Sequence, residues 1–160
     1  MKRIGVTGHR NIPAELHAHV RAAMTAVFDR HRGSSLEALS SLAVGADTLF
    51  ADIALASGAE LTVVVPSGDY ERGFTAPEEL TRYRTLKERA TREVRLSYAH
   101  STDEAYYAAG AYIADNCDRL LAVWDGRPSR GLGGTADIVH YARALGRPVT
   151  VIWRDGVERL

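Results

Sequence analysis

The chain has 160 residues, of which 46% are hydrophobic and 25% are charged, a composition that is typical of globular domains and excludes a disordered segment. Lys plus Arg and Asp plus Glu each number 20, which argues against nucleic acid as the partner because phosphate backbones are bound by excess positive charge. The single cysteine excludes an intrachain disulfide, and no apolar run approaches the roughly 20 residues that cross a membrane, so we expect a cytoplasmic protein without membrane contact.

Short β-prone runs alternate with helical patterns along the whole chain. Strands are expected at residues 4–7, 36–43, 61–65, 94–97, 119–124 and 149–153, because these runs are short and largely apolar, and residues 61–65 form the clearest one, a β-branched run that ends at Pro66. Helices are expected at residues 13–32, 46–56, 75–92, 101–116 and 135–145, where apolar residues recur at helical spacing. Two capping boxes, Thr75 with Glu78 and Ser101 with Glu104, support two of the helix starts.

This alternation predicts an α/β three-layer sandwich, with a mostly parallel central sheet covered by helices on both faces. The sequence contains no repeat, low-complexity stretch or linker, so residues 1–160 are expected to form a single domain. In such sheets ligands bind in the crevice beyond the carboxyl ends of the strands. The loops that follow the strands are therefore the place to look for a site.

The first loop, after residues 4–7, contains Thr7, Gly8, His9 and Arg10. Gly8 lets the backbone approach a ligand closely, Thr7 offers a hydroxyl, and His9 and Arg10 can bind an anionic group. The segment lacks the full GxGxxG pattern of a dinucleotide site. The alternative interpretation is a tight turn followed by a surface arginine.

Two further loops have more ambiguous residues. Gly45 and Ala46 precede Asp47 at a helix start, where Asp47 either caps the helix or contacts a ligand. Residues 67–74 form a long loop that contains Arg72. That loop is either an ordinary solvated loop or a lid whose Arg72 pairs with phosphate.

The strongest candidate is the Gly-rich segment with Gly131, Gly133, Gly134 and Thr135. It follows a buried strand and opens a helix, so its N–H groups and the positive end of the helix are expected to form a phosphate cradle. Upstream, Asp125 is a candidate to orient a ribose hydroxyl. The alternative is a flexible loop with a threonine cap.

Taken together, the segments at 5–10, 45–47, 124–126 and 133–135 resemble those of the LOG/DprA (SMF) superfamily, over most of the chain. The resemblance implies a Rossmann-like fold, a nucleotide-type ligand with its phosphate at residues 133–135, and a homodimer or larger assembly. In LOG enzymes, which cleave the base from a nucleoside 5′-monophosphate, this loop reads PGGxGTxxE and its Glu is catalytic. The corresponding residue here is Ile138, and Asp137 is turned from that position by about 100° on a helix.

Three functions are compatible with these residues. The favoured one is a module that binds a nucleotide or a nucleotide derivative, as a sensor or carrier. The second is an N-glycosidic hydrolase or transferase, for which Asp47 and Asp137 are the candidate catalytic carboxylates. The third, single-stranded DNA binding as in DprA, is less favoured because no basic surface is evident. Neither a metal site nor a cofactor is predicted.

Overall fold

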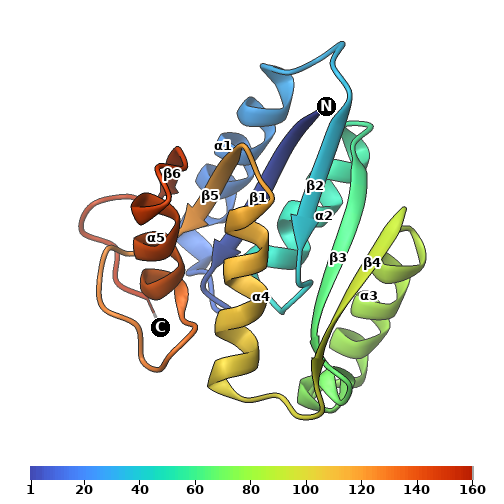
Figure 1. Ribbon diagram of the computed structural model, residues 1–160. Coiled ribbons are helices and arrows are strands. Elements are labelled where there is room, and N and C mark those ends of the chain that lie inside the picture. Colours follow the sequence, from blue (N-terminus) through green and yellow to red (C-terminus); the bar gives the residue numbers. More distant parts are fainter. Residues whose placement is uncertain (160) are drawn as a thin grey trace.

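The computed structural model describes residues 1–159, and within them six parallel strands form one sheet with the order β4-β3-β2-β1-β5-β6 (Figure 1). This topology confirms the predicted Rossmann-like α/β fold with a parallel sheet. The strands are β1 (Lys2–Gly8), β2 (Leu36–Ser40), β3 (Glu60–Ser67), β4 (Arg92–Tyr98), β5 (Arg119–Val123) and β6 (Val149–Ile152). The helices are η1 (Ala14–Leu16), α1 (His17–Asp29), α2 (Ala46–Ala56), η2 (Tyr70–Gly73), α3 (Pro77–Glu88), α4 (Asp103–Asp115) and α5 (Thr135–Ala144).

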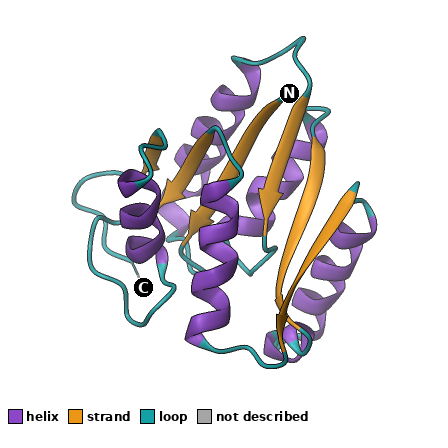
Figure 2. Cartoon of the chain, viewed as in Figure 1, coloured by secondary structure: helices purple, strands orange, loops and turns teal. Residues whose placement is uncertain are grey.

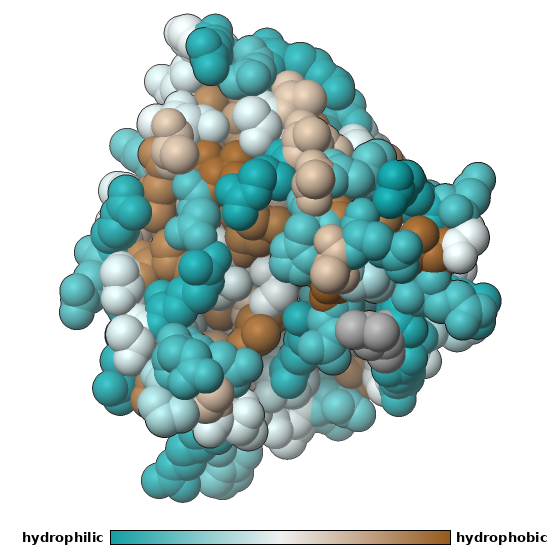
Figure 3. Space-filling view, turned by 180° about the vertical axis from the view of Figure 1, so that it is seen from behind, coloured by the Kyte–Doolittle hydropathy of each residue, from teal (hydrophilic) through white to brown (hydrophobic). Residues whose placement is uncertain are grey.

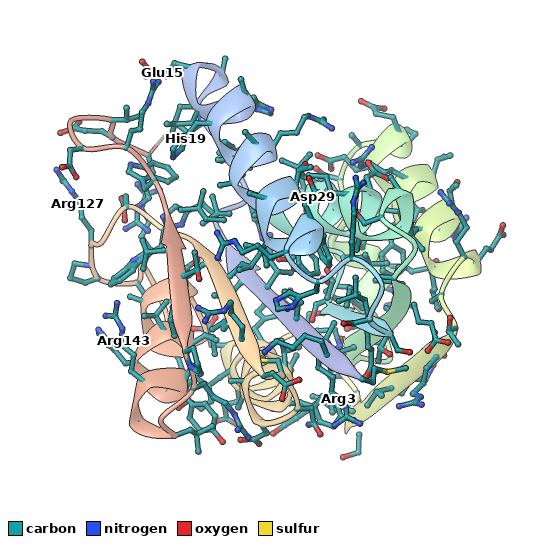
Figure 4. All side chains as sticks on the ribbon, turned by 90° about the horizontal axis from the view of Figure 1, so that it is seen from above. Arg3, Glu15, His19, Asp29, Arg127 and Arg143 are labelled. Atoms are coloured by element: carbon teal, nitrogen blue, oxygen red, sulfur yellow. The ribbon has the colours of Figure 1, made fainter. Side chains whose placement is uncertain are left out.

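The helices cover both faces of the sheet. Helices α4 and α5 lie on the face that points to the viewer in Figure 2, and α1, α2 and α3 lie on the opposite face. Viewed from above, His19 and Asp29 on α1 and Arg143 on α5 are on opposite sides of the strands (Figure 4). Because all strands are parallel, their carboxyl ends meet at one edge of the sheet, and the loops that follow them gather there.

The larger hydrophobic core lies between the sheet and the layer of α1, α2 and α3. Phe28 of α1 and Phe50 of α2 meet in it with ring centroids 5.4 Å apart. The buried residues of η1 and α1 face this core, namely Leu16, Val20, Met24, Val27 and Phe28. A second cluster lies under α4 and α5 and includes Ile113, Leu120 and Ile138. If residues 1–160 form one domain, as the sequence predicts, both clusters unfold in one transition.

Two predicted helix starts are wrong by one or two residues. Helix α3 begins at Pro77, whose fixed φ and missing N–H suit the first helical position, and the N–H of Ala76 donates to the Glu79 carboxylate at 3.2 Å. Helix α4 begins after Thr102, whose hydroxyl accepts the N–H of Ala105 at 3.2 Å. Neither predicted capping box forms, because the neighbouring residue takes the capping position in each case.

Strand β2 ends at Ser40, three residues before its predicted end. Leu42 is buried with a left-handed φ of 57°, and its N–H donates to the Ser40 hydroxyl at 3.0 Å. This turn redirects the chain toward α2, and it places Ser41 and Ala43 at the edge of the sheet where the strands end.

Figure 3 shows the face formed by α1, α2 and α3, on which hydrophobic surface is visible in a hollow between hydrophilic ridges. A cavity of about 400 Å³ lies on this side between residues 10–12, α1, α2 and α3, with Ile12 and Leu49 among its apolar lining residues. Within residues 1–159, no helix is both long enough and apolar enough to span a bilayer.

We expect Gly8→Ala to lower the free energy of unfolding by about 2 kcal/mol, because overpacking at a rigid contact strains the fold. A Cβ at Gly8 would lie 2.5 Å from the Cβ of Ala46 and 2.9 Å from that of Val123. Gly73→Ala is the matched control, since a Cβ there meets no atom within 4 Å among the described residues. Urea unfolding monitored by circular dichroism measures both variants. Equal stability of the two would contradict the predicted close approach of β1 to α2.

Candidate functional site

A cleft of about 480 Å³ lies at the carboxyl edge of the sheet, within the size range of about 300–1,000 Å³ that is usual for small-molecule sites. It combines the end of β1, the start of α2, the side of α4, the Gly-rich loop and the C-terminal segment. Of the predicted site residues, Thr7, Gly8, His9, Arg10, Asp47, Gly131, Gly133, Gly134 and Thr135 line it. These residues come from three separate loops, and the fold brings them together.

The Gly-rich loop is held in place by its own backbone groups. The N–H of Gly133 donates to the Asp137 carboxylate at 3.1 Å, and the N–H of Gly134 donates to the carbonyl of Gly131 at 3.2 Å. These two N–H groups are therefore not the phosphate donors that the sequence suggested. Gly133 is required for packing instead, since its φ is 86° and a Cβ would lie 2.7 Å from the backbone nitrogen of Tyr107.

The donors that remain at this end of the cleft belong to the start of α5. The first N–H groups of a helix have no acceptor within the helix, and they carry its partial positive charge. Thr135, the first residue of α5, is buried and lines the cleft. A hydroxyl and a helix start thus converge on the same point, which favours an anionic group.

Behind Thr135, buried polar side chains from four segments form a continuous chain. Nδ1 of His9 lies 3.5 Å from the Thr135 hydroxyl, and Nε2 lies 3.2 Å from the backbone nitrogen of Asp125 and 3.3 Å from its Oδ1. The other carboxylate oxygen of Asp125 lies 3.2 Å from Nε of Arg159. Trp153 packs edge-on against the His9 ring with centroids 5.4 Å apart. No pattern in the sequence links these residues.

The environment shifts the pKa values of this chain of side chains. Burial lowers the pKa of His9, and the positive charges of Arg159 and Arg130 contribute in the same direction, against the opposing effect of Asp125. Burial raises the pKa of Asp125, but the hydrogen bond from the N–H of Arg127 and the charge of Arg159 outweigh it, so that the pKa is lowered. At neutral pH His9 is therefore an uncharged ring beside a charged carboxylate.

A carboxyl group with unusual acidity lies at the opposite wall of the cleft. Asp47 is half-buried in the first turn of α2, and its Oδ2 accepts the N–H of Ala43 at 3.3 Å. It does not cap α2, because Gly45 holds the capping position. Burial raises the pKa of Asp47 to about 7, although Ala43 and the positive charge of Arg10 oppose the shift. The group is therefore close to half-protonated at neutral pH.

Aromatic rings line the same wall. The guanidinium of Arg10 lies 5.7 Å from the ring centroid of Tyr106 on α4, and Tyr70 of η2 meets Tyr106 edge-on at 6.5 Å. Both tyrosines line the cleft. Tyr70, Phe74 and Tyr83 form an aromatic cluster that anchors the loop 67–74.

Comparison with solved structures identifies proteins of the same architecture. The DNA processing protein A (DprA) of Streptococcus pneumoniae matches with a TM-score of 0.72 at 19% identity, over 99% of this chain and 52% of that chain. DprA of Helicobacter pylori, whose structure concerns single-stranded DNA binding, matches with a TM-score of 0.69 at 15% identity, over 99% and 68% of the two chains. The molybdenum cofactor carrier protein of Chlamydomonas reinhardtii matches with a TM-score of 0.56 at 17% identity, over 94% and 75%.

The chain has the Rossmann-like fold of the LOG/DprA type. The structural match confirms the resemblance that the motifs indicated, at the level of the fold. The chain spans about half the length of S. pneumoniae DprA. No protein-family model matches the sequence, and no curated protein sequence is significantly similar to it.

Within this LOG/DprA-type fold, the two carboxylates proposed for catalysis have different positions. Asp47 lines the cleft, whereas Asp137 lines a separate cavity beside Trp124 and His140 and binds the N–H of Gly133. Ile138 lines the cleft at the position where the resemblance implies a catalytic Glu. Its side chain packs closely against Gly110 of α4, where an added Cβ would overlap it. The floor of the cleft is therefore apolar at that point.

The other predicted site residues lie around the cleft but do not line it. Gly45 lines the neighbouring cavity and Ala46 is buried beneath the cleft. Arg72 is exposed, because Tyr70 rather than Arg72 is the residue of the 67–74 loop that packs into the site. Asp125 lies behind His9, where it is paired with Arg159 and is not positioned to hold a ribose.

Several cleft residues could not be found from the sequence. They stand in segments without a recognisable motif, and the principal ones are Asn11, Ser41, Asp103, Tyr106, Arg130 and Arg159. Tyr106 belongs to a helix face that sequence analysis interprets as packing, and Arg159 lies in a C-terminal segment that follows the last strand. Within residues 1–159, no group of His, Cys, Asp and Glu side chains is suited to holding a metal ion.

The raised pKa of Asp47 predicts a specific pH dependence of stability. The folded pKa of Asp47, about 7, lies above the usual value of 3.8. The stability that the protonated Asp47 carboxyl contributes to the fold is therefore complete at acidic pH and is lost as the pH rises toward 7. We expect this group to lower the free energy of unfolding by about 2 kcal/mol between pH 5 and pH 8. Urea unfolding across this range should show that Asp47→Asn lacks this fall, whereas a variant at the exposed Asp155, Asp155→Asn, retains it. Parallel curves for wild type and Asp47→Asn would contradict the assignment.

Proposed function

We propose that the cleft binds a nucleotide or a nucleotide-derived ligand, with a phosphate group against the start of α5. The observation that carries this proposal is the convergence of the Thr135 hydroxyl and the helix start with Arg10 and Arg130 on one cleft. An anionic group is stabilised at a helix start and by guanidinium side chains. The proposal extends the fold-level likeness to DprA and the molybdenum cofactor carrier protein, which by itself identifies no ligand.

The opposite wall suits the remainder of such a ligand. Tyr106 offers an aromatic face, a group that stacks on nucleobases. Asp47 lies on the same side and, with its pKa near 7, it both accepts and donates hydrogen bonds to a sugar or base. A phosphate near Thr135 and a ring near Tyr106 would together occupy both ends of the cleft.

A sensor or carrier fits this arrangement better than a LOG-type hydrolase. LOG catalysis depends on a carboxylate that projects from the helix after the Gly-rich loop, and this helix presents Ile138 to the cleft. Asp137 serves the loop by binding Gly133. The second candidate function, N-glycosidic cleavage or transfer, is favoured only by Asp47, which is suited to proton transfer because its pKa lies near the working pH.

Binding is predicted to depend on the phosphate and on Arg10. AMP, ADP, ATP, ADP-ribose and NAD are compared with adenosine by thermal shift and titration calorimetry. A ligand at 100 times its dissociation constant stabilises the fold by about 2.7 kcal/mol, and adenosine is expected to give no shift. Arg10→Gln should weaken binding about tenfold through loss of a charge-assisted contact. The control is Arg30→Gln, at an exposed residue after α1. The proposal fails if none of the phosphate-bearing compounds shifts the transition.

An assay for release of the base from nucleoside monophosphates, with chromatography as the readout, distinguishes a carrier function from an enzymatic one. We expect no release by the wild-type protein. If release occurs, Asp47→Asn should abolish it while AMP still binds, and Asp137→Asn should retain it because Asp137 lies outside the cleft. Loss of turnover in Asp137→Asn with an unchanged thermal transition would contradict the structural role given to Asp137.

Two further expectations belong with this proposal. The homodimer or larger assembly implied by the resemblance stays a prediction, and light scattering after size exclusion measures it. Single-stranded DNA binding is the less favoured alternative, since the charge of the chain is balanced and phosphate backbones are bound by an excess of positive charge. A salt-sensitive gel shift with oligonucleotides would reverse that preference.

A further inference from the structure

His9 is buried at the end of β1, between the backbone of Asp125 and the hydroxyl of Thr135. Burying an imidazole ring is unfavourable unless its nitrogens find partners. Both nitrogens do so here, and one of the partners is the cleft residue at the start of α5. The state of this ring therefore affects what Thr135 offers to a ligand.

We propose that His9 is a positioning residue that donates its Nδ1–H to Oγ1 of Thr135, so that the Thr135 hydroxyl directs its proton toward the ligand and favours an unprotonated phosphate oxygen as the acceptor. This inference rests on the proposed function, and it narrows the ligand group at this subsite to an oxyanion. An amino group of a base would bring a donor to a donor there, and a sugar hydroxyl would accept only as a neutral group, which makes a weaker hydrogen bond than a charged oxyanion.

The position of the ring proton follows from the contact with Asp125. The backbone N–H of Asp125 points at Nε2 of His9 over 3.2 Å, and a backbone N–H can only donate. Nε2 must therefore be the unprotonated nitrogen. A neutral imidazole carries one proton, and burial keeps His9 neutral by lowering its pKa. The proton is consequently on Nδ1, which lies 3.5 Å from Oγ1 of Thr135.

The opposite tautomer would give a different chemistry. With the proton on Nε2, the ring would donate to Oδ1 of Asp125 at 3.3 Å, and Nδ1 would accept from Thr135. This is the carboxylate–imidazole–hydroxyl order that activates a nucleophile. It is disfavoured here because the backbone N–H of Asp125 would lose its acceptor, at a cost of about 1–3 kcal/mol.

Accepting from His9 has a defined effect on Thr135. A threonine hydroxyl has one proton and two acceptor lone pairs. Once a lone pair is occupied by Nδ1–H, the proton is available for the cleft. At the start of α5 beside it, the N–H of Asp137 donates to the Ser129 hydroxyl at 3.2 Å, and the N–H groups of Thr135 and Ala136 have no acceptor within the helix. Arg130 lines the same end of the cleft and is close enough to affect the His9 charge. Every group on this wall then favours an oxyanion.

The tautomer can be measured without any ligand. In protein labelled with ¹⁵N at histidine, long-range proton–nitrogen correlation spectra distinguish a protonated from an unprotonated ring nitrogen. His9→Asn identifies the His9 signals by their loss. We expect Nδ1 of His9 to be the protonated nitrogen. Protonation at Nε2 overturns the inference and points to the nucleophile arrangement, whatever the outcome of nucleotide binding.

A double-mutant cycle tests whether His9 acts through Thr135, with inorganic pyrophosphate as the probe. Thr135→Val and His9→Leu are each expected to weaken pyrophosphate binding by about tenfold, the effect of one lost hydrogen bond to a charged group. The double variant should lose no more than Thr135→Val alone. Additive losses would show that His9 acts by another route and would overturn the inference.

Two conservative variants separate positioning from folding. His9→Asn keeps a donor near the position of Nδ1, and Thr135→Ser keeps the hydroxyl, so both should bind pyrophosphate within about threefold of wild type. Thermal unfolding of each variant shows whether the fold is intact. If the wild-type protein binds no phosphate-bearing probe, both the proposed function and the proposed ligand class are wrong. The NMR experiment still shows whether His9 carries its proton on Nδ1 and so can donate to Thr135.

Discussion

The close packing of the β1 end against the start of α2 is the constraint on which the site depends. Gly45 has a φ of 95°, and any side chain there would overlap the backbone carbonyl of Arg10. The N–H of Ala46 donates to the carbonyl of His9 at 3.2 Å, and the N–H of His9 donates to Val123 at 3.1 Å. The segment 9–10 is thereby clamped between α2 and β5. His9 is directed into the interior, and Arg10 is left at the cleft.

Next to this contact between β1 and α2, the polar side chains of Thr135, His9, Asp125 and Arg159 form a connected chain at the edge of the sheet. A buried imidazole and a buried carboxylate are tolerated because each has several partners, including the Arg159 guanidinium and the N–H of Arg127. The C-terminal segment after β6 contributes to the site through Arg159, although it contributes no strand. The connection between Thr135 and this segment gives the cleft a rigid, prearranged wall at the end where the phosphate is proposed to bind.

The other wall is held by aromatic packing and by a second polar cluster. Asp69 accepts the N–H of Ser101 at 2.8 Å and the Ser67 hydroxyl at 2.9 Å, and it contacts His100 at 3.1 Å. This cluster ties the end of β3 to the start of α4, and with it the ring of Tyr70 to that of Tyr106. The loop 67–74 is therefore a packed wall of the cleft, and the lid interpretation of its sequence is not supported by this arrangement.

The sequence by itself determined the architecture, because the alternation of β-branched runs and helical periodicity is a local property of the chain. It also indicated the edge of the sheet at which the cleft lies, since parallel strands bring the segments with Thr7, Asp47 and Thr135 to one edge. It could not determine which polar groups face a ligand and which are used internally. Gly133 and Asp137 look like ligand-binding residues in the sequence, yet the N–H of Gly133 donates to the carboxylate of Asp137. On α5, Ile138 rather than Asp137 faces the cleft. Arg159 and Tyr106 enter the site only through tertiary packing, because contacts between segments that are distant in the sequence leave no mark on local spacing. The same holds for the His9–Thr135 contact, where burial and a backbone N–H from a third segment, rather than any motif, decide which nitrogen carries the proton.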